Sequence, residues 1–280
     1  MQKFIRKYLD RLFFKKWTIG ICKGNIEEII RTKTFDPDIE WLRPKSNSTF
    51  YADPFLVQGN NGTYKVLLEE YPYKENYGKI SLMTFDKDFK LNDHKVVLDT
   101  SSHLSYPFAF TEKGKTYIFP ESAQNDKLSC YEYDPKTETI SFVKNIIDLP
   151  LRDSTIIKYD GKYWIFGTMS DNGLDYKLNV YYSDELLGPY QPHRENPIKN
   201  GLDGTRSAGN FITIDGEIYR PTQNCLNSYG ESITINKIVE LSEVSVVEEP
   251  YMTIDLNPNN KNNMRMNTIH TINVLNNTLV

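Results

Sequence analysis

A single pattern recurs five times along this chain: a short strand, a tight turn that carries glycine or asparagine, and a second strand. The repeats begin near residues 53, 106, 153, 208 and 270, so the period is about 50 residues. Glycine and asparagine suit these turns, because hairpin turns require positive φ. Most repeats are followed by a further hairpin. Four strands per repeat at this period are typical of a β-propeller. The sequence therefore predicts an all-β fold, a five-bladed β-propeller with a short N-terminal helical segment.

The last repeat reaches the end of the sequence after only two strands. A strand at about 17–22 would complete the fifth blade and remove the edges that an open ring exposes. A short helix is expected at 26–31. No linker interrupts the repeats, so we expect one propeller domain at 17–280, preceded by a separate helix at 1–16. The alternative architecture, a β-sandwich or two stacked β domains, does not account for five recurrences of one pattern.

Residues 1–16 have the pattern of a basic amphipathic helix. Apolar residues recur at helical spacing on one face, and six lysines or arginines stand against Asp10 alone. Such a helix either packs on the protein's own flank or lies on an anionic membrane surface.

Composition narrows the compartment and the partners. The net charge of −4 gives no reason to expect nucleic acid as a partner, and no apolar run reaches the roughly 18 residues of a membrane span. The first residues do not open into the apolar run of a signal peptide. Three widely spaced cysteines form neither a disulfide framework nor a metal site. We therefore expect a cytoplasmic protein, either free or peripheral to the inner face of the membrane through residues 1–16.

The starts of the five repeats carry polar and charged residues. In a propeller the first strand of each blade lines the central channel, so these residues should converge near the axis. Charged groups there cost desolvation free energy unless they are paired or functional. They either join the blades by pairing with one another or serve a ligand, and the two roles are compatible. The five starts carry Asp53, Tyr106, Asp153, Arg206 and His270.

The ends of the second strands add further candidates. Glu69 and Glu70 are adjacent, so strand alternation sends them to opposite faces, and the analogy of position with Glu121 favours Glu70. Paired carboxylates across a cavity suit glycosyl chemistry. An arginine can grip a phosphate, and tyrosines can stack on sugar rings. No metal motif is strong. The candidate catalytic residues are Asp53, Asp153 and Glu121, and the candidate substrate-binding residues are Glu70, Tyr106, Arg206, Gln223, Tyr229, Glu231 and His270.

A set of motifs in order resembles the N-terminal domain of plant glucosamine inositolphosphorylceramide transferases, over roughly residues 17–280. In the plant enzymes the recognised glycosyltransferase domain is a separate C-terminal one, so the resemblance implies the fold more than the activity. The motifs are Ala-Asp-Pro-Phe at 52–55, Ser-Tyr-Pro-Phe at 105–108, Pro-Glu-Ser at 120–122, Asp-Ser-Thr at 153–155, Arg-Ser-Ala-Gly at 206–209 and Tyr-Arg-Pro-Thr-Gln at 219–223.

More remotely, the chain resembles five-bladed glycosidases of the arabinanase, β-xylosidase and invertase type. That resemblance implies a base or nucleophile at Asp53, a tuning carboxylate at Asp153 and a central ion near His270. It also implies a general acid on the fourth blade, where this chain has Arg206-Ser207-Ala208-Gly209 and no glutamate. Glu121 or Glu231 would have to supply the acid from elsewhere.

The leading functional hypothesis is a glycosyltransferase in cell-surface polysaccharide or glycolipid synthesis. Asp53 would be the base that activates an acceptor hydroxyl. Asp153 and Glu121 would orient Asp53 or tune its pKa, and Arg206 would bind the phosphate of a nucleotide-sugar donor. A nucleotide sugar has a good leaving group and does not need the missing acid. No other cofactor is required, and the ion near His270 is optional. The alternatives are a glycoside hydrolase of the propeller type and a non-catalytic carbohydrate-binding module.

Overall fold

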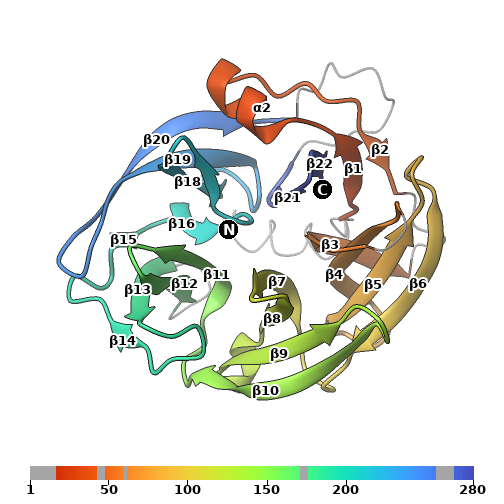
Figure 1. Cartoon of the computed structure of the whole chain (residues 1–280), viewed down its shortest axis with the longest axis horizontal. Coiled ribbons are helices and arrows are strands. Elements are labelled where there is room, and N and C mark those ends of the chain that lie inside the picture. Colours follow the sequence, from red (N-terminus) through yellow and green to blue (C-terminus); the bar gives the residue numbers. More distant parts are fainter. Residues whose placement is uncertain (1–16, 43–47, 60–61, 171–175, 257–267) are drawn as a thin grey trace, which may run out of the picture.

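Alternating apolar residues and tight turns fold the chain into antiparallel sheets arranged around a central axis (Figure 1). The computed structural model describes residues 17–42, 48–59, 62–170, 176–256 and 268–280. The predicted five-bladed β-propeller is confirmed. The helix predicted at 1–16 lies outside the described residues and stays a prediction.

Blades 1 to 4 follow one another along the chain, and each begins near the axis and continues outward (Figure 1). Blade 1 consists of β3 (Thr49–Val57), β4 (Tyr64–Pro72), β5 (Lys79–Phe85) and β6 (Leu91–Leu98). Blade 2 consists of β7 (Ser105–Glu112), β8 (Lys115–Glu121), β9 (Leu128–Asp134) and β10 (Thr139–Ile147), with a short 3-10 turn, η1 (Ala123–Asn125). Blade 3 consists of β11 (Arg152–Tyr159), β12 (Lys162–Ser170), β13 (Tyr176–Ser183), β14 (Gln191–Pro192) and β15 (Lys199–Asn200). Blade 4 consists of β16 (Asp203–Ser207), β17 (Ile212–Ile214), β18 (Glu217–Asn224), β19 (Ser232–Leu241) and β20 (Val246–Ile254).

Blade 5 brings the two ends of the propeller into one sheet. Its strand order is β2 (Glu40–Trp41), β1 (Gly20–Lys23), β22 (Thr278–Leu279) and β21 (Val274–Leu275). β1 pairs antiparallel with β22, so that Cys22 lies opposite Leu279. A strand from the start of the chain therefore closes the ring through hydrogen bonds to its last strand, and the edges of these strands are covered.

One short helix, α2 (Ile26–Thr32), follows β1 and lies outside blade 5 (Figure 1). It begins where expected, because the side chain of Asn25 accepts hydrogen bonds from the backbone N–H groups of Glu27 and Glu28 at its first turn. Within the described segments no helix is long and apolar enough to cross a membrane.

Apolar side chains fill the spaces between neighbouring blades. Phe55 of blade 1 lies 5.9 Å from Phe108 of blade 2 between ring centroids. Both belong to one hydrophobic cluster with Ile165 of blade 3, and each of these side chains is almost completely buried. Burying a side chain of this size contributes about 1.5–3 kcal/mol to stability. This core holds the first strands of adjacent blades at fixed positions around the axis.

The first strands of blades 1 to 3 contain the same irregularity at the same place. The pairing register shifts after Ala52, Ser105 and Arg152, which marks a β-bulge in each strand. The next residue, Asp53, Tyr106 or Asp153, has a left-handed backbone with φ of 50°, 43° or 45°. Such a conformation costs roughly 1–3 kcal/mol for a residue other than glycine and is concentrated at functional sites. The repeated bulge therefore marks these three positions near the axis as a candidate site.

Candidate functional site

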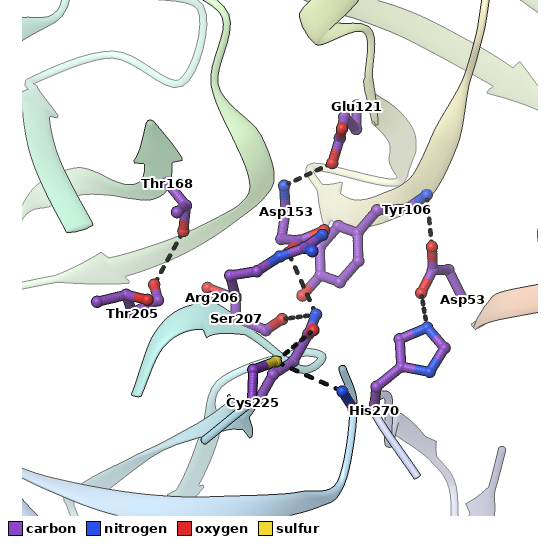
Figure 2. Close-up of polar contacts among 12 residues, drawn as sticks. Asp53, Tyr106, Glu121, Asp153, Thr168, Thr205, Arg206, Ser207, Cys225 and His270 are labelled. Atoms are coloured by element: carbon purple, nitrogen blue, oxygen red, sulfur yellow. Dashed lines mark hydrogen bonds and ion pairs between the residues drawn. The ribbon is translucent and has the colours of Figure 1, made fainter. Parts of the chain in front are cut away.

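The repeat starts converge at the axis, as the sequence predicts. Figure 2 shows two neighbouring sets of polar contacts, one that joins Asp53 to Tyr106 and His270 and one that joins Asp153 to Arg206. Each of these residues is less than one-tenth exposed. These side chains pair across blades and also lie close together. The structure is therefore compatible with both roles considered for them, joining the blades and serving a ligand.

Asp53 is held by three donors. Its Oδ1 lies 3.0 Å from Nε2 of His270 and accepts a 2.9 Å hydrogen bond from the hydroxyl of Thr271, and its Oδ2 accepts a 3.3 Å bond from the backbone N–H of Tyr106. Burial alone would raise the pKa of Asp53, but the bonds and charge of His270 and the bond from Thr271 hold it below the usual value. The carboxylate is therefore ionised and fixed in orientation at neutral pH.

Asp153 forms the second fixed carboxyl of the site. Its Oδ2 accepts hydrogen bonds from Nε of Arg206 at 2.5 Å and from Nε2 of Gln223 at 3.2 Å. The guanidinium carbon of Arg206 lies 5.0 Å from the centroid of the Tyr229 ring, a cation–π distance. Burial would lower the pKa of Arg206, but the charge and hydrogen bond of Asp153, together with the nearby acidic groups of Tyr229 and Glu121, outweigh burial and raise the pKa. This buried ion pair joins blades 3 and 4.

Glu121 is the third carboxyl that the sequence singled out. Its Oε2 accepts a 3.2 Å hydrogen bond from the backbone N–H of Asp153. Burial, together with the adjacent charge of Asp153, raises its pKa to about 8. Glu121 therefore keeps its proton at neutral pH, whereas Asp53 is ionised. Carboxyl groups whose pKa values are pushed apart in this way are the usual mark of an acid and a base at one site.

The prediction that Glu70, rather than Glu69, faces the axis is wrong, because the structure places Glu69 beside the axial carboxyl groups. In blade 2, Glu121 pairs with the residue before the bulge, and in blade 1 the residue that pairs with Ala52 is Glu69. Glu70 pairs with Tyr51, one residue before Ala52, so strand alternation sends its side chain to the other face. Burial and then the charges of Asp53, Glu121 and Asp153 raise the pKa of Glu69 well above its usual value.

Glu70 lies on the opposite face of blade 1. It accepts hydrogen bonds from Ser81 at 2.5 Å and lies 2.8 Å from Nε2 of His94. Burial would raise the pKa of Glu70, but the hydrogen bonds of His94 and Ser81 and the nearby charges of His94 and Lys79 together outweigh burial and hold it below the usual value. Glu70 therefore stabilises the outer strands of blade 1 and does not join the axial cluster.

Three other predicted binding residues have contacts that differ from those expected. The ring of Tyr106 is fully buried, and its hydroxyl group exchanges bonds with Thr155 at 2.9 Å and with the N–H of Gly209 at 2.8 Å, so it joins blades 2, 3 and 4 and offers no face to a sugar. Glu231 accepts bonds from Asn227 within its own loop. Gln223 is buried against Asp153 and the carbonyl of Ser207, which makes it a support of the ion pair.

Tyr229 and His270 keep the places that the sequence suggested. Tyr229 is 37% exposed, and its ring lies 5.5 Å from the ring of His270 and 5.0 Å from the guanidinium carbon of Arg206. Sequence reasoning missed Thr271, which directly follows His270 and hydrogen-bonds to Asp53. Its signal was present, because a hydroxyl residue beside a predicted site histidine is a natural second donor to a carboxylate.

The ion expected near His270 finds few ligands. His270 and Asp53 are adjacent, but within the part of the chain that the structure describes no group of three or more His, Cys, Asp or Glu side chains is arranged to hold a metal ion. The ion near His270 stays a prediction, and the chemistry below is derived from the side chains themselves.

The raised pKa of Glu121 predicts a particular pH dependence of stability. In the unfolded chain this carboxyl loses its proton near the ordinary value of 4.5, and in the folded protein near 8. The stabilisation is therefore complete below the lower value and is lost as the pH rises through the higher one, at about 1.4 kcal/mol for each pKa unit. We expect the melting temperature to fall between about pH 5 and about pH 8.5, and Glu121→Gln to flatten this fall. Calorimetry of both proteins tests this, and equal slopes would contradict it.

The fold and the axial cluster define the class of protein first: a five-bladed β-propeller with a buried, charged cluster near its axis. Solved structures with this fold include a family 117 glycoside hydrolase from Zobellia galactanivorans, at a TM-score of 0.56 and 15% identity over 73% of this chain and 69% of that one. An exo-β-1,3-galactanase from Phanerochaete chrysosporium has a TM-score of 0.57 at 12% identity, over 75% of this chain and 54% of that one. At these identities the likeness shows the fold alone.

The sequence itself shows the family. The chain belongs to the family described as glucosamine inositolphosphorylceramide transferase 1, N-terminal, whose model matches residues 42–277. Glucosamine inositolphosphorylceramide transferase 1 of Arabidopsis thaliana is 34% identical over 214 residues, or 73% of this chain. The match spans only 28% of the length of that relative.

Proposed function

We propose that this propeller is a carbohydrate-active enzyme that transfers a sugar from a nucleotide-sugar donor, in the synthesis of a cell-surface polysaccharide or glycolipid. The observation that carries the proposal is the convergence of an ionised Asp53, a protonated Glu121 and the Asp153–Arg206 pair at the axis. The proposal is supported by the family to which the chain belongs, because that family and its curated relatives are named as transferases.

In the proposed reaction Asp53 is the general base. An acceptor hydroxyl placed at its carboxylate gives up its proton to Asp53 as the hydroxyl oxygen bonds to the anomeric carbon of the donor. The bond from that carbon to the donor phosphate breaks, and the phosphate leaves with the electron pair. Asp153 holds Arg206 by Nε, so the two terminal nitrogens of the guanidinium are the groups that would meet the phosphate.

A second function, glycoside hydrolysis, is favoured by one observation. Glu121 keeps its proton up to about pH 8, and a protonated carboxyl is what a leaving sugar oxygen requires. Water would then attack the anomeric carbon and lose its proton to Asp53, while Glu121 protonates the departing oxygen. This would supply the acid that the start of blade 4 lacks.

A thermal-shift screen with nucleotide sugars, free nucleotides and neutral oligosaccharides tests the proposal. A ligand at about 100 times its dissociation constant stabilises a protein by about 2.7 kcal/mol, which the screen resolves. We expect a shift with one nucleotide sugar, followed by release of its nucleotide when an acceptor is added. Turnover of oligosaccharides alone would move the assignment to a hydrolase. Sugar binding with no turnover of either substrate would reduce the domain to a binding module.

A further inference from the structure

Blade 1 carries three aromatic rings on the side of β3 and β4 that also bears Glu69, at Phe50, Tyr71 and Tyr73. Phe50 pairs with Tyr71 across β3 and β4, as Ala52 pairs with Glu69, so strand alternation places their side chains on one face. The rings of Phe50 and Tyr71 are stacked, with centroids 4.8 Å apart and an interplanar angle of 6°. The ring of Tyr73 lies 5.9 Å from Phe50. All three are half-buried. We call Phe50, Tyr71 and Tyr73 the aromatic row.

The inner end of the aromatic row is polar. The ring of His103 lies 5.9 Å from that of Tyr71, and its Nδ1 accepts a 2.9 Å hydrogen bond from the N–H of Gly78. Burial lowers the pKa of His103, so the ring is neutral at pH 7 and its proton is on Nε2. This donor faces Oε1 of Glu69 at 3.8 Å, which is too long for a direct hydrogen bond and suits a bridging hydroxyl group.

Close packing fixes the carboxyl of Glu69 at this point. A Cβ atom at Gly78 would lie 2.6 Å from Oε1 of Glu69 and 2.4 Å from the carbonyl oxygen of Leu104, so only glycine fits there. Glu69 is 6% exposed, and the nearby charges of Asp53, Glu121 and Asp153 raise its pKa. The aromatic row is thus continuous, through Glu69, with the axial cluster.

We propose that the aromatic row, with Glu69 and His103 at its inner end, is a second sugar-binding subsite, which takes a ring of a glycan next to the ring that reacts at Asp53. A sugar ring has an apolar C–H face and a rim of hydroxyl groups. The apolar face matches the half-buried rings, and a hydroxyl matches the pair formed by Glu69 and His103. The substrate at this site is therefore an oligosaccharide of at least two rings. The identity of the reacting ring rests on the proposed function.

Two variants on the same strand test the subsite. Tyr71→Leu removes the central ring of the row, and Tyr64→Leu removes a ring at the opposite end of β4, where Tyr64 packs 5.0 Å from Phe89. The probes are oligosaccharides of one to four β-linked glucose, galactose or N-acetylglucosamine rings, titrated by calorimetry. We expect wild-type affinity to rise with length. Tyr71→Leu should lower the affinity for the longer probes by about 2- to 12-fold and leave the affinity for the single ring unchanged. Tyr64→Leu should bind all probes as the wild type does.

A second matched pair tests the polar end. Glu69→Leu removes both carboxyl oxygens and should weaken the binding of the longer probes, whereas Glu70→Leu, one residue along on the opposite face, should not. Tyr73→Leu replaces Tyr71→Leu if the latter fails to fold by circular dichroism.

Wild-type affinity that does not change with length, or equal effects of the paired variants, would overturn the subsite. Transfer from a nucleotide sugar is measured separately, so that result would leave the proposed function standing. Affinity that rises with oligosaccharide length, without turnover of a nucleotide sugar, would instead support the subsite and contradict the proposed transferase function.

Discussion

Asp53→Asn should lower the rate of glycosyl transfer by about 10²- to 10⁴-fold, the range that a positioned general base contributes. The wild-type carboxylate is ionised and presents two acceptor oxygens to His270, Thr271 and the N–H of Tyr106. An asparagine amide cannot take up a proton from the acceptor hydroxyl. Its NH2 group would also face one of these three donors, so some stability should be lost as well.

The rate effect is separated from the stability effect by two comparisons. Asp93→Asn changes an exposed aspartate on β6 of the same blade and should leave turnover unchanged. Donor binding by Asp53→Asn, measured by thermal shift, should persist while turnover is lost. Full turnover in Asp53→Asn would show that another group takes the proton, and the assignment of the base would be withdrawn.

The sequence predicted the propeller because each blade repeats the same local signals. Turn glycines and asparagines, alternating apolar residues and a constant period all require the same architecture, and α2 could be predicted from Asn25 and the residues after it. Local signals of this kind do not depend on partners far along the chain. The convergence of Asp53, Tyr106, Asp153, Arg206 and His270 followed from the fold, because blade starts must meet at the axis.

Which side chains within that region face the axis could not be read from counting alone. The side chain beside Asp53 is Glu69 because the register of β3 and β4, which shifts at the bulge, places it opposite Ala52. Tyr106 is buried and not exposed to a ligand, because its hydroxyl group hydrogen-bonds to Thr155 and Gly209 on two other blades. Such contacts depend on distances between blades, which no local pattern of residues encodes.

Arg206→Met should destabilise the protein strongly. Asp153, whose side chain is 2% exposed, would lose its ion-pair partner and keep only the hydrogen bond from Gln223. Glu69 and Glu121 would also lose a nearby positive charge. Removing one partner of a buried pair costs about 3–5 kcal/mol, because the other charge remains buried. Chemical denaturation should show this loss. Lys115→Met, in the exposed pair with Glu132, should leave the free energy of unfolding nearly unchanged.

A double-mutant cycle distinguishes a true pair from two independent contributions. In Asp153→Asn the carboxylate charge is gone, so adding Arg206→Met should cost less than it does in the wild type, with a coupling energy of about 1–3 kcal/mol. Additive losses would mean that Arg206 is stabilised by the rings of Tyr229 and Tyr176 rather than by Asp153. A strong coupling would have a further consequence for catalysis. A guanidinium held by Asp153 through Nε keeps one orientation, and a fixed orientation is what the grip on a donor phosphate requires.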